Sequence, residues 1–462
     1  MTGRRWLVLS LIFFLAFLYS ESTHAATINA ASCSQSDVQS AVNSAARGDT
    51  VVVPAGNCSW SSVVSLGSKP ITLQGAGSGG GTTIADGRSC QPSSGGYDLL
   101  SFTEDAALST RITGFAFTGA GYAHHTIGCS GASDYSSAPA RIDHNSFATR
   151  SGGDGCSGGG PGGTVLEGFS CRGLVDHNSF TSNDNSETIH NWGPGASGWT
   201  SPVSVQPGST NALYVETNTF YNSNNVFAAQ SAMENYDAAR VVGRYNQVAN
   251  AQFDTHGGDN NGTRWFEFYN NNFCTNPSGG QDKYFDIRAG SGVIFGNTHN
   301  GAGSICTATG SSGAAIVFRG ESRGSDCSDI GGVGCWVGMG ISQKLWSPAY
   351  VWGNGSDMPV VTGSSGSNYV VTAGVNYIVS ATQPASMVIL ERTTDSCGSN
   401  GTNPGIGNTA PPLASTAATG CTTYSYAPFT YPYPLDSNGL PNPGGSGTTA
   451  PAPPTGLQVS VT

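Results

Sequence analysis

Short apolar runs that end in Asn recur along the middle of the chain. The segments RIDHNSF (141–147) and LVDHNSF (174–180) share one pattern, and later segments align with it on the same Asn. The aligned residues are Asn145, Asn178, Asn218, Asn246, Asn271 and Asn297, so the steps between them are 33, 40, 28, 25 and 26 residues by subtraction. Repeats of this length, built from β-branched runs and turns rich in Gly and Asn, predict a solenoid in which each repeat forms one coil.

Two apolar columns accompany the Asn column and indicate how the coils stack. The residues three before each Asn are Ile142, Val175, Val215, Gly243, Phe268 and Ile294, and those two after it are Phe147, Phe180, Phe220, Val248, Phe273 and His299. Both columns are expected to face the core, while the Asn amides hydrogen-bond from coil to coil at a turn. The pattern therefore predicts an all-β protein, a right-handed parallel β-helix.

The two ends of the solenoid have a different pattern. Val38, Ala41, Val42 and Ala45 follow a helical period, which predicts a short capping helix at the N-terminal end. Residues 26–435 are expected to form one β-helix domain whose C-terminal region is rich in loops. Residues 436–456 have the Pro/Gly/Ser/Thr composition of a linker, and 457–462 resemble the start of a further module that is cut off.

The first 25 residues predict secretion. Arg4 and Arg5 precede an apolar run that is shorter than the roughly 20 residues of a membrane span, and small residues near Ala25 offer a cleavage site. We therefore expect a signal peptide over 1–25, no membrane span, and a secreted monomer. Only 10% of the residues are charged, 66 are Gly, and the net charge is −11, which argues against nucleic-acid binding because that requires a basic face.

The 12 cysteines are expected to form disulfides in an oxidising compartment. Pairing of near neighbours gives Cys33 with Cys58, Cys156 with Cys171, Cys274 with Cys306, Cys327 with Cys335, Cys397 with Cys421, and Cys90 with Cys129. Connectivity does not follow from sequence, so this scheme is a hypothesis.

The repeated IDHNSF segment and the run from YVETNTF to VIFGN resemble the pectate-lyase-like family of right-handed parallel β-helices. The entry through GDTVVVPAG and ITLQGAG is similar to that of many such proteins. The resemblance covers roughly residues 27–360 and implies the fold. It does not select the chemistry, because the superfamily includes lyases, hydrolases, esterases, epimerases, tailspikes and adhesins.

A column of acidic residues suggests a cation site. The residues two before each Asn should face outward, and they include Asp143, Asp176 and Glu216, followed by Arg244 and Tyr269. Three stacked carboxylates without a cation would repel one another, so Ca²⁺ is the expected ligand, and no organic cofactor is expected. The resemblance implies the same, since pectate lyases use such carboxylates to hold Ca²⁺ against a uronate.

A concentration of Arg and His suggests chemistry on a polysaccharide. We expect His190, His256, Arg288 and Arg319 to share a second outward face. For β-elimination on a uronate polymer, Arg244 or Arg288 would neutralise the carboxylate or act as the base, with His256 and Tyr269 as base or acid. Inverting hydrolysis is the alternative, with Glu216, Asp254 and Glu267 as its carboxylates. Substrate contacts are assigned to His190, Arg264, Arg319, Tyr284 and Trp265.

Each of these residues also has a structural interpretation. Arg244 with Glu216, or Arg264 with Glu267, would be ion pairs on a solenoid surface, worth under about 1 kcal/mol each. His144 and His177 would be inward-facing or turn residues that hydrogen-bond to the backbone. The whole protein would then be a non-catalytic carbohydrate-binding or adhesive β-helix.

Overall fold

The structure is a computed structural model. It describes residues 25–79, 81–88, 98–120, 125–149, 164–182, 188–195, 207–222, 231–257, 262–274, 283–299, 316–319, 348–363, 371, 373, 376–385, 387–388, 423–424 and 426–437.

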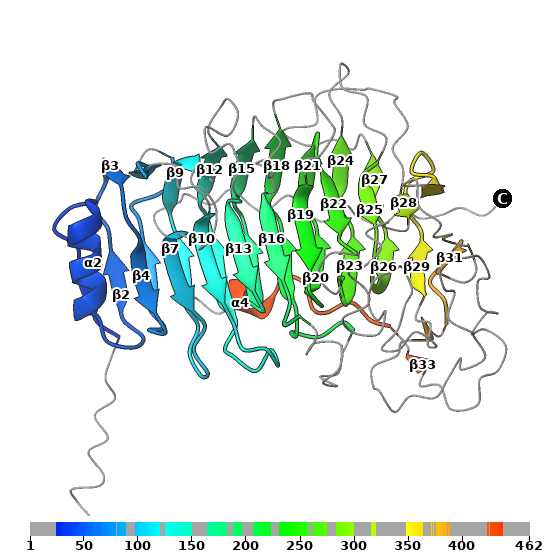
Figure 1. Ribbon diagram of the computed structural model, residues 1–462, viewed down its shortest axis with the longest axis horizontal. Helices are drawn as coiled ribbons and strands as arrows, with labels where there is room; N and C mark the ends of the chain where they lie inside the picture. The colour runs from blue at the N-terminus through cyan, green and yellow to red at the C-terminus, as the bar shows by residue number, and fades with distance from the viewer. Residues whose placement is uncertain are drawn as a thin grey trace, which may run out of the picture.

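Three long sheets of parallel strands wind around one axis, which confirms the predicted parallel β-helix (Figure 1). Sheet 1 has 12 strands: β1 (Thr27–Asn29), β2 (Thr50–Val52), β5 (Thr72–Gln74), β8 (Arg111–Thr113), β11 (Ala140–Asp143), β14 (Gly173–Asp176), β17 (Leu213–Glu216), β20 (Arg240–Arg244), β23 (Trp265–Tyr269), β26 (Ser291–Phe295), β29 (Ala349–Trp352) and β31 (Tyr377–Ser380). Sheet 2 has nine strands: β3 (Gly56–Trp60), β6 (Thr82–Asp86), β9 (Phe115–Ala120), β12 (Ser146–Thr149), β15 (Ser179–Ser182), β18 (Thr219–Asn222), β21 (Gln247–Ala249), β24 (Asn272–Cys274) and β27 (Thr298–His299).

Sheet 3 has 10 strands: β4 (Val64–Gly67), β7 (Asp98–Thr103), β10 (His125–Ser130), β13 (Leu166–Phe169), β16 (Ile189–Trp192), β19 (Ser231–Tyr236), β22 (Gln252–Thr255), β25 (Phe285–Ile287), β28 (Ile316–Arg319) and β30 (Val360–Gly363). In a typical coil the chain runs from sheet 1 to sheet 2 to sheet 3, as in β11, β12 and β13, and β14 then begins the next coil. A separate antiparallel pair joins β32 (Met387–Val388) and β33 (Thr423–Tyr424).

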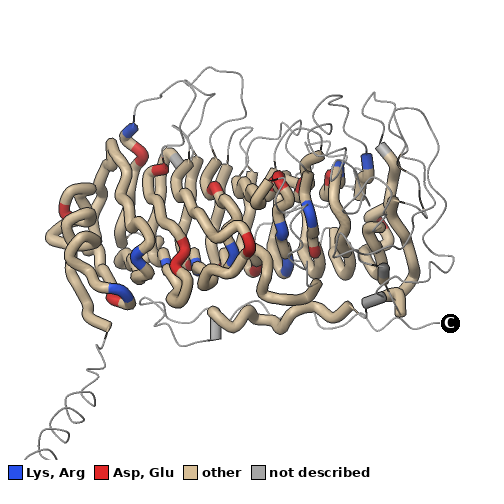
Figure 2. The backbone as a smooth tube through the Cα atoms, turned by 60° about the horizontal axis from the view of Figure 1, so that its bottom comes forward, with Lys and Arg blue, Asp and Glu red and all other residues tan. Residues whose placement is uncertain are grey.

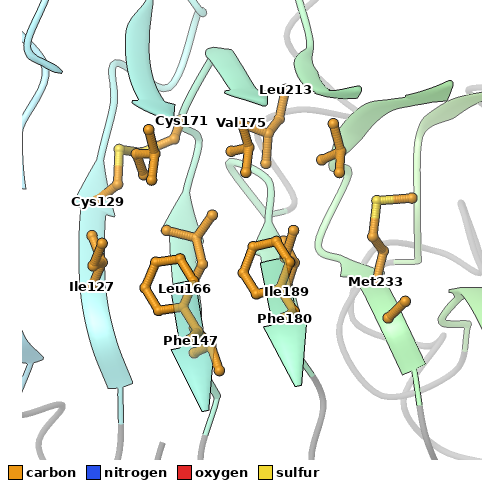
Figure 3. Close-up of a cluster of buried hydrophobic side chains, with 14 of the residues drawn as sticks. Ile127, Cys129, Phe147, Leu166, Cys171, Val175, Phe180, Ile189, Leu213 and Met233 are labelled. Atoms are coloured by element: carbon orange, nitrogen blue, oxygen red, sulfur yellow. A yellow bond between two sulfur atoms is a disulfide. The ribbon is translucent and has the colours of Figure 1, made fainter. Parts of the chain in front are cut away.

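The predicted columns form the core. Ile142, Val175 and Val215 lie in register and are buried. The rings of Phe147 and Phe180 stack with their centroids 5.0 Å apart. Figure 3 shows these aromatic side chains beside an apolar column on sheet 3 that includes Leu166, Ile189 and Met233.

Gly243 interrupts the first apolar column for a steric reason. A Cβ at this position would lie 2.6 Å from Met233 Cε and 2.9 Å from Phe253 Cε2. The bulky side chains of sheet 3 therefore fill the space that the other coils give to Val or Ile, as close packing of the interior requires.

The Asn ladder forms as predicted and continues beyond the predicted coils. The Asn145 amide donates to Asn178 Oδ1 at 3.2 Å, and the same contact repeats in each coil until Asn297 donates to Asn354 at 2.9 Å. Each side chain also donates to a main-chain carbonyl, as Asn178 does to Ile142. The ladder thus satisfies buried polar groups at the turn between sheets 1 and 2.

A helix caps the N-terminal end, as the sequence predicts. Helix α2 (Gln35–Ser44) begins at the N-cap Ser34, whose side chain accepts from the Asp37 amide, and it buries Val38, Ala41 and Val42. These side chains cover the apolar end of the first coils.

The C-terminal residues of the described chain return along the solenoid. Residues 426–437, which we call the C-terminal segment, end in helix α4 (Pro434–Ser437). The segment runs along the side of sheet 1 toward the N-terminal end (Figures 1 and 2). In the described part of the chain, no helix is long and apolar enough to cross a membrane.

The disulfide scheme is partly wrong. Cys33 pairs with Cys58 as predicted, but Cys129 pairs with Cys171 on a neighbouring coil, which excludes the predicted partners Cys90 and Cys156. Sequence proximity misled here because the coil, and not the chain, sets which cysteines are neighbours. Cys274 is disulfide-bonded, and its predicted partner Cys306 lies outside the described residues, as do the other two predicted pairs.

Candidate functional site

The solenoid divides the predicted site residues between two outward faces. Arg244, Tyr269, Glu267, Trp265 and the three predicted metal ligands belong to sheet 1. Asp254, His256, Arg288, Arg319 and His190 lie in or directly after strands of sheet 3. The carboxylates proposed for hydrolysis are therefore not brought together, since Glu216 and Glu267 are on sheet 1 and Asp254 is on sheet 3.

The acidic column of sheet 1 stacks in register as predicted, but each carboxylate has an arginine partner. Arg111 donates to Asp143 at 2.7 and 2.5 Å, and Arg141 donates to Asp176 at 3.0 and 2.7 Å. Although burial opposes ionisation of Asp143, hydrogen bonds from Arg111 and His144 lower its pKa to about 2.

Arginine therefore supplies the positive charge that Ca²⁺ was expected to bring. Glu216 completes the series, since Arg244 donates to it at 2.6 Å. Among the described residues, only Glu104, Cys129 and Cys171 bring three possible metal ligands within 4.8 Å of one another, and the two sulfurs there form a disulfide.

The C-terminal segment covers this face. Arg244 donates to the carbonyl oxygens of Phe429 at 2.7 Å and Thr430 at 2.9 Å, and to the Tyr269 hydroxyl at 2.8 Å. The Tyr433 amide donates to Glu216 at 2.9 Å. Arg244 is fully buried, so its guanidinium holds the C-terminal segment against the coils instead of facing solvent.

Glu267 has the same role one coil further on. It accepts from the Tyr426 hydroxyl at 2.6 Å, from Trp265 Nε1 at 3.0 Å and from the Gly208 amide at 2.8 Å. Burial raises the pKa of Glu267, and these donors oppose that effect. Glu267, predicted as catalytic, thus contacts the C-terminal segment, a neighbouring turn and Trp265, which was predicted to contact substrate.

Two further predicted substrate contacts lie inside the protein. Tyr284 is fully buried in the core, with its ring 4.9 Å from that of Phe273. Arg264 is buried directly before β23. Neither position favours contact with a polymer.

Sheet 3 carries two outward columns. The first contains Glu167, His190, Glu234, Asp254 and Asp286 in register. The second, two residues further along each strand, contains Phe169, Trp192 and Tyr236, and then His256, Arg288 and Arg319. The prediction of a shared face is correct, but His190 lies in the acidic column and not beside His256.

The cations of this face bind the acidic column. Arg288 donates to both oxygens of Asp254 at 2.9 and 2.8 Å and to Glu234 at 2.7 Å. Arg319 donates to Asp286 at 2.6 and 2.5 Å, and Lys283 forms an ion pair with the same carboxylate. The side chains of Arg319 and Lys283 are each 27% exposed, against 10% for Arg288, so these two are the more accessible of the three.

Neighbouring carboxyls in this column have opposite pKa shifts. Burial raises the pKa of Asp254 well above its ordinary value, despite the attraction of Arg288. At Asp286 burial also opposes ionisation, but hydrogen bonding to Arg319 and the charge of Lys283 hold the pKa below its ordinary value. Carboxyls with pKa values driven apart are typical of sites that carry out acid–base chemistry.

His256 lies between the aromatic and cationic parts of the second column. Its Nδ1 is 2.8 Å from the Gly257 carbonyl oxygen, so Nδ1 must carry the proton that is donated. In the neutral ring Nε2 is then the basic nitrogen, and it lies 3.9 Å from Glu234 Oε1. The ring stacks on Tyr236 with centroids 4.2 Å apart, which fixes its orientation.

The aromatic part of the column reaches the surface. The Trp192 ring stacks on Tyr236 at 4.6 Å and lies nearly parallel to Phe169 at 6.3 Å, and Trp192 Nε1 donates to Glu167. Phe169 is 47% exposed.

Several residues of this face are not among the sequence predictions. They are Asp98, His125, Glu167, Glu234 and Lys283, and His125 lies 3.0 Å from Asp98 and 3.5 Å from Glu167. Aligning LEGF, IHNW and MENY with FDTHG and FDIR places Glu167 and Glu234 in one column, so the sequence contained a signal for these two residues.

The structural histidines differ from the prediction in one detail. His144 and His177 sit at turns with φ of 54° and 53°, and their Nδ1 atoms lie 2.7 Å from Asp143 and Asp176, carboxylate partners that the prediction did not include.

No family model matches the sequence, and no curated protein matches it. Among solved structures, an alginate lyase from Paenibacillus sp. str. FPU-7 aligns with a TM-score of 0.36 and 15% identity, covering 78% of this chain and 95% of the lyase. The Geobacillus virus E2 protein ORF18 aligns with a TM-score of 0.30 and 13% identity, covering 78% and 64%. The PL6 family alginate lyase AlyGC aligns with a TM-score of 0.26 and 14% identity, covering 74% and 53%.

The class of protein is thus defined by the architecture. The chain forms a parallel β-helix. Its C-terminal segment covers the outward face of sheet 1, and the outward face of sheet 3 is the candidate functional site.

Proposed function

We propose that this protein is a secreted carbohydrate-active enzyme that cleaves a uronate-containing polysaccharide by β-elimination at the outward face of sheet 3. One observation carries the proposal: a single column passes from the aromatic Trp192 and Tyr236, through His256, to Arg288 and Arg319. Aromatic side chains, a basic nitrogen and accessible cations are the groups that binding and deprotonating a uronate require.

Exposure assigns the binding role to Lys283 and Arg319, whose side chains are each 27% exposed, whereas His256, only 7% exposed, is assigned by the orientation of its Nε2 and its place in the column. Lys283 and Arg319 neutralise the uronate carboxylate, which lowers the pKa of the adjacent C5 proton. His256 Nε2 takes that proton, the C4–O bond breaks, and a C4=C5 double bond forms. The leaving oxygen then takes up a proton, which protonated His256 can return.

Arg288 has a positioning role in this mechanism. Its guanidinium binds Asp254 and Glu234, and Glu234 in turn faces His256. Arg244 and Tyr269, the other predicted catalytic residues, have no step here because the C-terminal segment covers them.

Inverting hydrolysis remains the second candidate, and one feature favours it. Asp254 is a buried carboxyl with a raised pKa in the same column as Glu234, and a general acid needs such a carboxyl. Non-catalytic binding of a polysaccharide is the third candidate, and the experiment below also tests it.

The test is incubation of the full chain with a panel of uronate polymers, with and without a chelator. New absorbance of unsaturated uronate supports the lyase. New reducing ends without that absorbance would replace it with a hydrolase. Retention of a polymer without any product would leave only a binding protein.

A further inference from the structure

We infer that the substrate of this face is a mixed polysaccharide, with a uronate unit at the Lys283 and Arg319 end and uncharged sugar units at the Phe169 end. The inference rests on the proposed function and names its substrate class. It depends on how charge and aromatic surface are distributed along the two outward columns of sheet 3.

Among the described strands of this face and the residues beside them, Lys and Arg lie near β25 and β28. The described strands β7, β10, β13, β16 and β19 contain no Lys or Arg, whereas Arg319 lies in β28 and Lys283 and Arg288 flank β25. The strands without Lys or Arg do contain carboxylates. Glu234 is paired with Arg288, whereas Asp98 and Glu167 lie beside His125 and His190. A uniformly anionic chain lying along the face would therefore meet like charge over its N-terminal part.

Glu167 is the carboxylate that such a chain would approach most closely near the aromatic end. It is buried, and it accepts from Trp192 Nε1 and lies 3.0 Å from His190 Nδ1. These contacts fix the carboxylate beside Trp192 and His190. A sugar carboxylate placed over this position would be repelled, and such repulsion excludes a competing ligand as effectively as attraction selects the correct one.

The aromatic end offers a surface for an uncharged ring instead. In the preceding coil the residue in register with Phe169 is Ser130, which is exposed and too small to cover the phenyl ring. Trp192 packs on the other side of Phe169. One face of Phe169 is thus open above Ser130, and the apolar C–H face of a neutral sugar ring fits such a surface.

The two ends are spaced for a polymer. Phe169, Trp192, Tyr236, His256, Arg288 and Arg319 come from successive coils, so the column spans about 24 Å at the usual spacing of about 4.8 Å between strands. A polysaccharide lying along the axis would cover several units over this length. Only the units nearest β25 and β28 would meet accessible cations.

The test compares two polymers with the same full-length protein. One is a homopolymer of uronate, and the other alternates uronate with a neutral hexose. We expect kcat/KM to be at least about tenfold higher for the alternating polymer, which corresponds to about 1.4 kcal/mol. Phe169→Ala should raise KM for the alternating polymer more than it lowers kcat, because the residue binds a sugar away from the bond that is cleaved. Glu167→Gln should lower the ratio of kcat/KM for the alternating polymer to kcat/KM for the homopolymer.

The outcomes separate this inference from the proposed function. A higher kcat/KM for the homopolymer, unaffected by Phe169→Ala, would overturn the mixed-chain inference and leave the lyase intact. If neither polymer is cleaved, the proposed function fails, and retention of the two polymers in affinity electrophoresis decides the inference. Retention of the alternating polymer that Phe169→Ala weakens supports it, and equal retention of both polymers overturns it.

Discussion

The outward faces of sheets 1 and 3 carry similar ladders of arginine and carboxylate, yet their surroundings differ. On sheet 1, Arg244 binds Glu216 and two carbonyl oxygens of the C-terminal segment, and it is fully buried. On sheet 3, Arg319 binds Asp286 and keeps 27% of its side chain exposed. The comparison teaches that the same residue types act as a structural clamp or as a candidate ligand site, depending on what covers them.

The largest expected effect separates the two faces by stability. Arg244→Ala would leave Glu216 buried without its cation, so we expect the free energy of unfolding to fall by about 3–5 kcal/mol. Arg319→Ala removes a partly exposed partner and should cost less. Chemical denaturation of both variants measures the difference. Equal losses would show that the two faces are covered alike.

A second prediction concerns Glu104, which follows β7 of sheet 3 and accepts from the Arg172 amide just before β14 of sheet 1. Burial raises the pKa of Glu104 from 4.5 to about 7, so the folded protein holds this proton more tightly than the unfolded chain. Its stabilising contribution is present below pH 4.5 and is lost as the pH rises to about 7.

The expected loss over this range is about 2–4 kcal/mol. Glu104→Gln should flatten this part of the stability profile, measured by denaturation at a series of pH values. An identical slope in the variant would mean that Glu104 does not titrate there.

The contact between the C-terminal segment and sheet 1 gives a third prediction. Tyr426→Phe removes the hydroxyl that donates to buried Glu267, and we expect a loss of about 1–3 kcal/mol in the free energy of unfolding. Tyr221→Phe, on sheet 2 and away from the C-terminal segment, is a matched control that should change little. A comparable loss of stability in Tyr221→Phe would mean that the hydrogen bond from Tyr426 to Glu267 does not explain the loss in Tyr426→Phe.

The smallest expected effect concerns Ca²⁺. Because Arg111, Arg141 and Arg244 already neutralise Asp143, Asp176 and Glu216, added Ca²⁺ should change the free energy of unfolding by less than about 1 kcal/mol. Thermal unfolding with Ca²⁺ or chelator measures it. A clear upward shift of Tm with Ca²⁺, abolished by Asp176→Asn, would instead support the predicted metal site.

The sequence predicted the coils well because stacking imposes one residue type on each column. Asn145 and its counterparts, and the Phe column that begins near Phe147, must align if each coil is to satisfy its neighbours. The same reasoning failed for His190, since loops of different length between sheets 2 and 3 hide the register from simple spacing.

The candidate site could be predicted only in part. Arg244 and Arg288 are both predicted to be catalytic. The residues around Arg244 in the sequence do not indicate that Phe429, 185 residues further on, covers it. The sequence does contain a signal for the partners of the acidic column. Arg141 lies two residues before Asp143 in the same strand, and Arg111 occupies the equivalent position one coil earlier. Which face is open depends on the return of the C-terminal segment, a long-range contact that column patterns do not contain.

The most direct test of whether chemistry belongs to sheet 3 compares two histidines on different faces. His256→Gln replaces the proposed base, and His177→Gln replaces a histidine at a turn beside sheet 1. On the uronate polymer that the wild-type protein cleaves fastest, we expect His256→Gln to lower the rate of unsaturated product formation by about 10²–10⁴-fold, with His177→Gln near the wild-type rate. Full activity in His256→Gln, or an equal loss in His177→Gln, would contradict the assignment of the site to sheet 3.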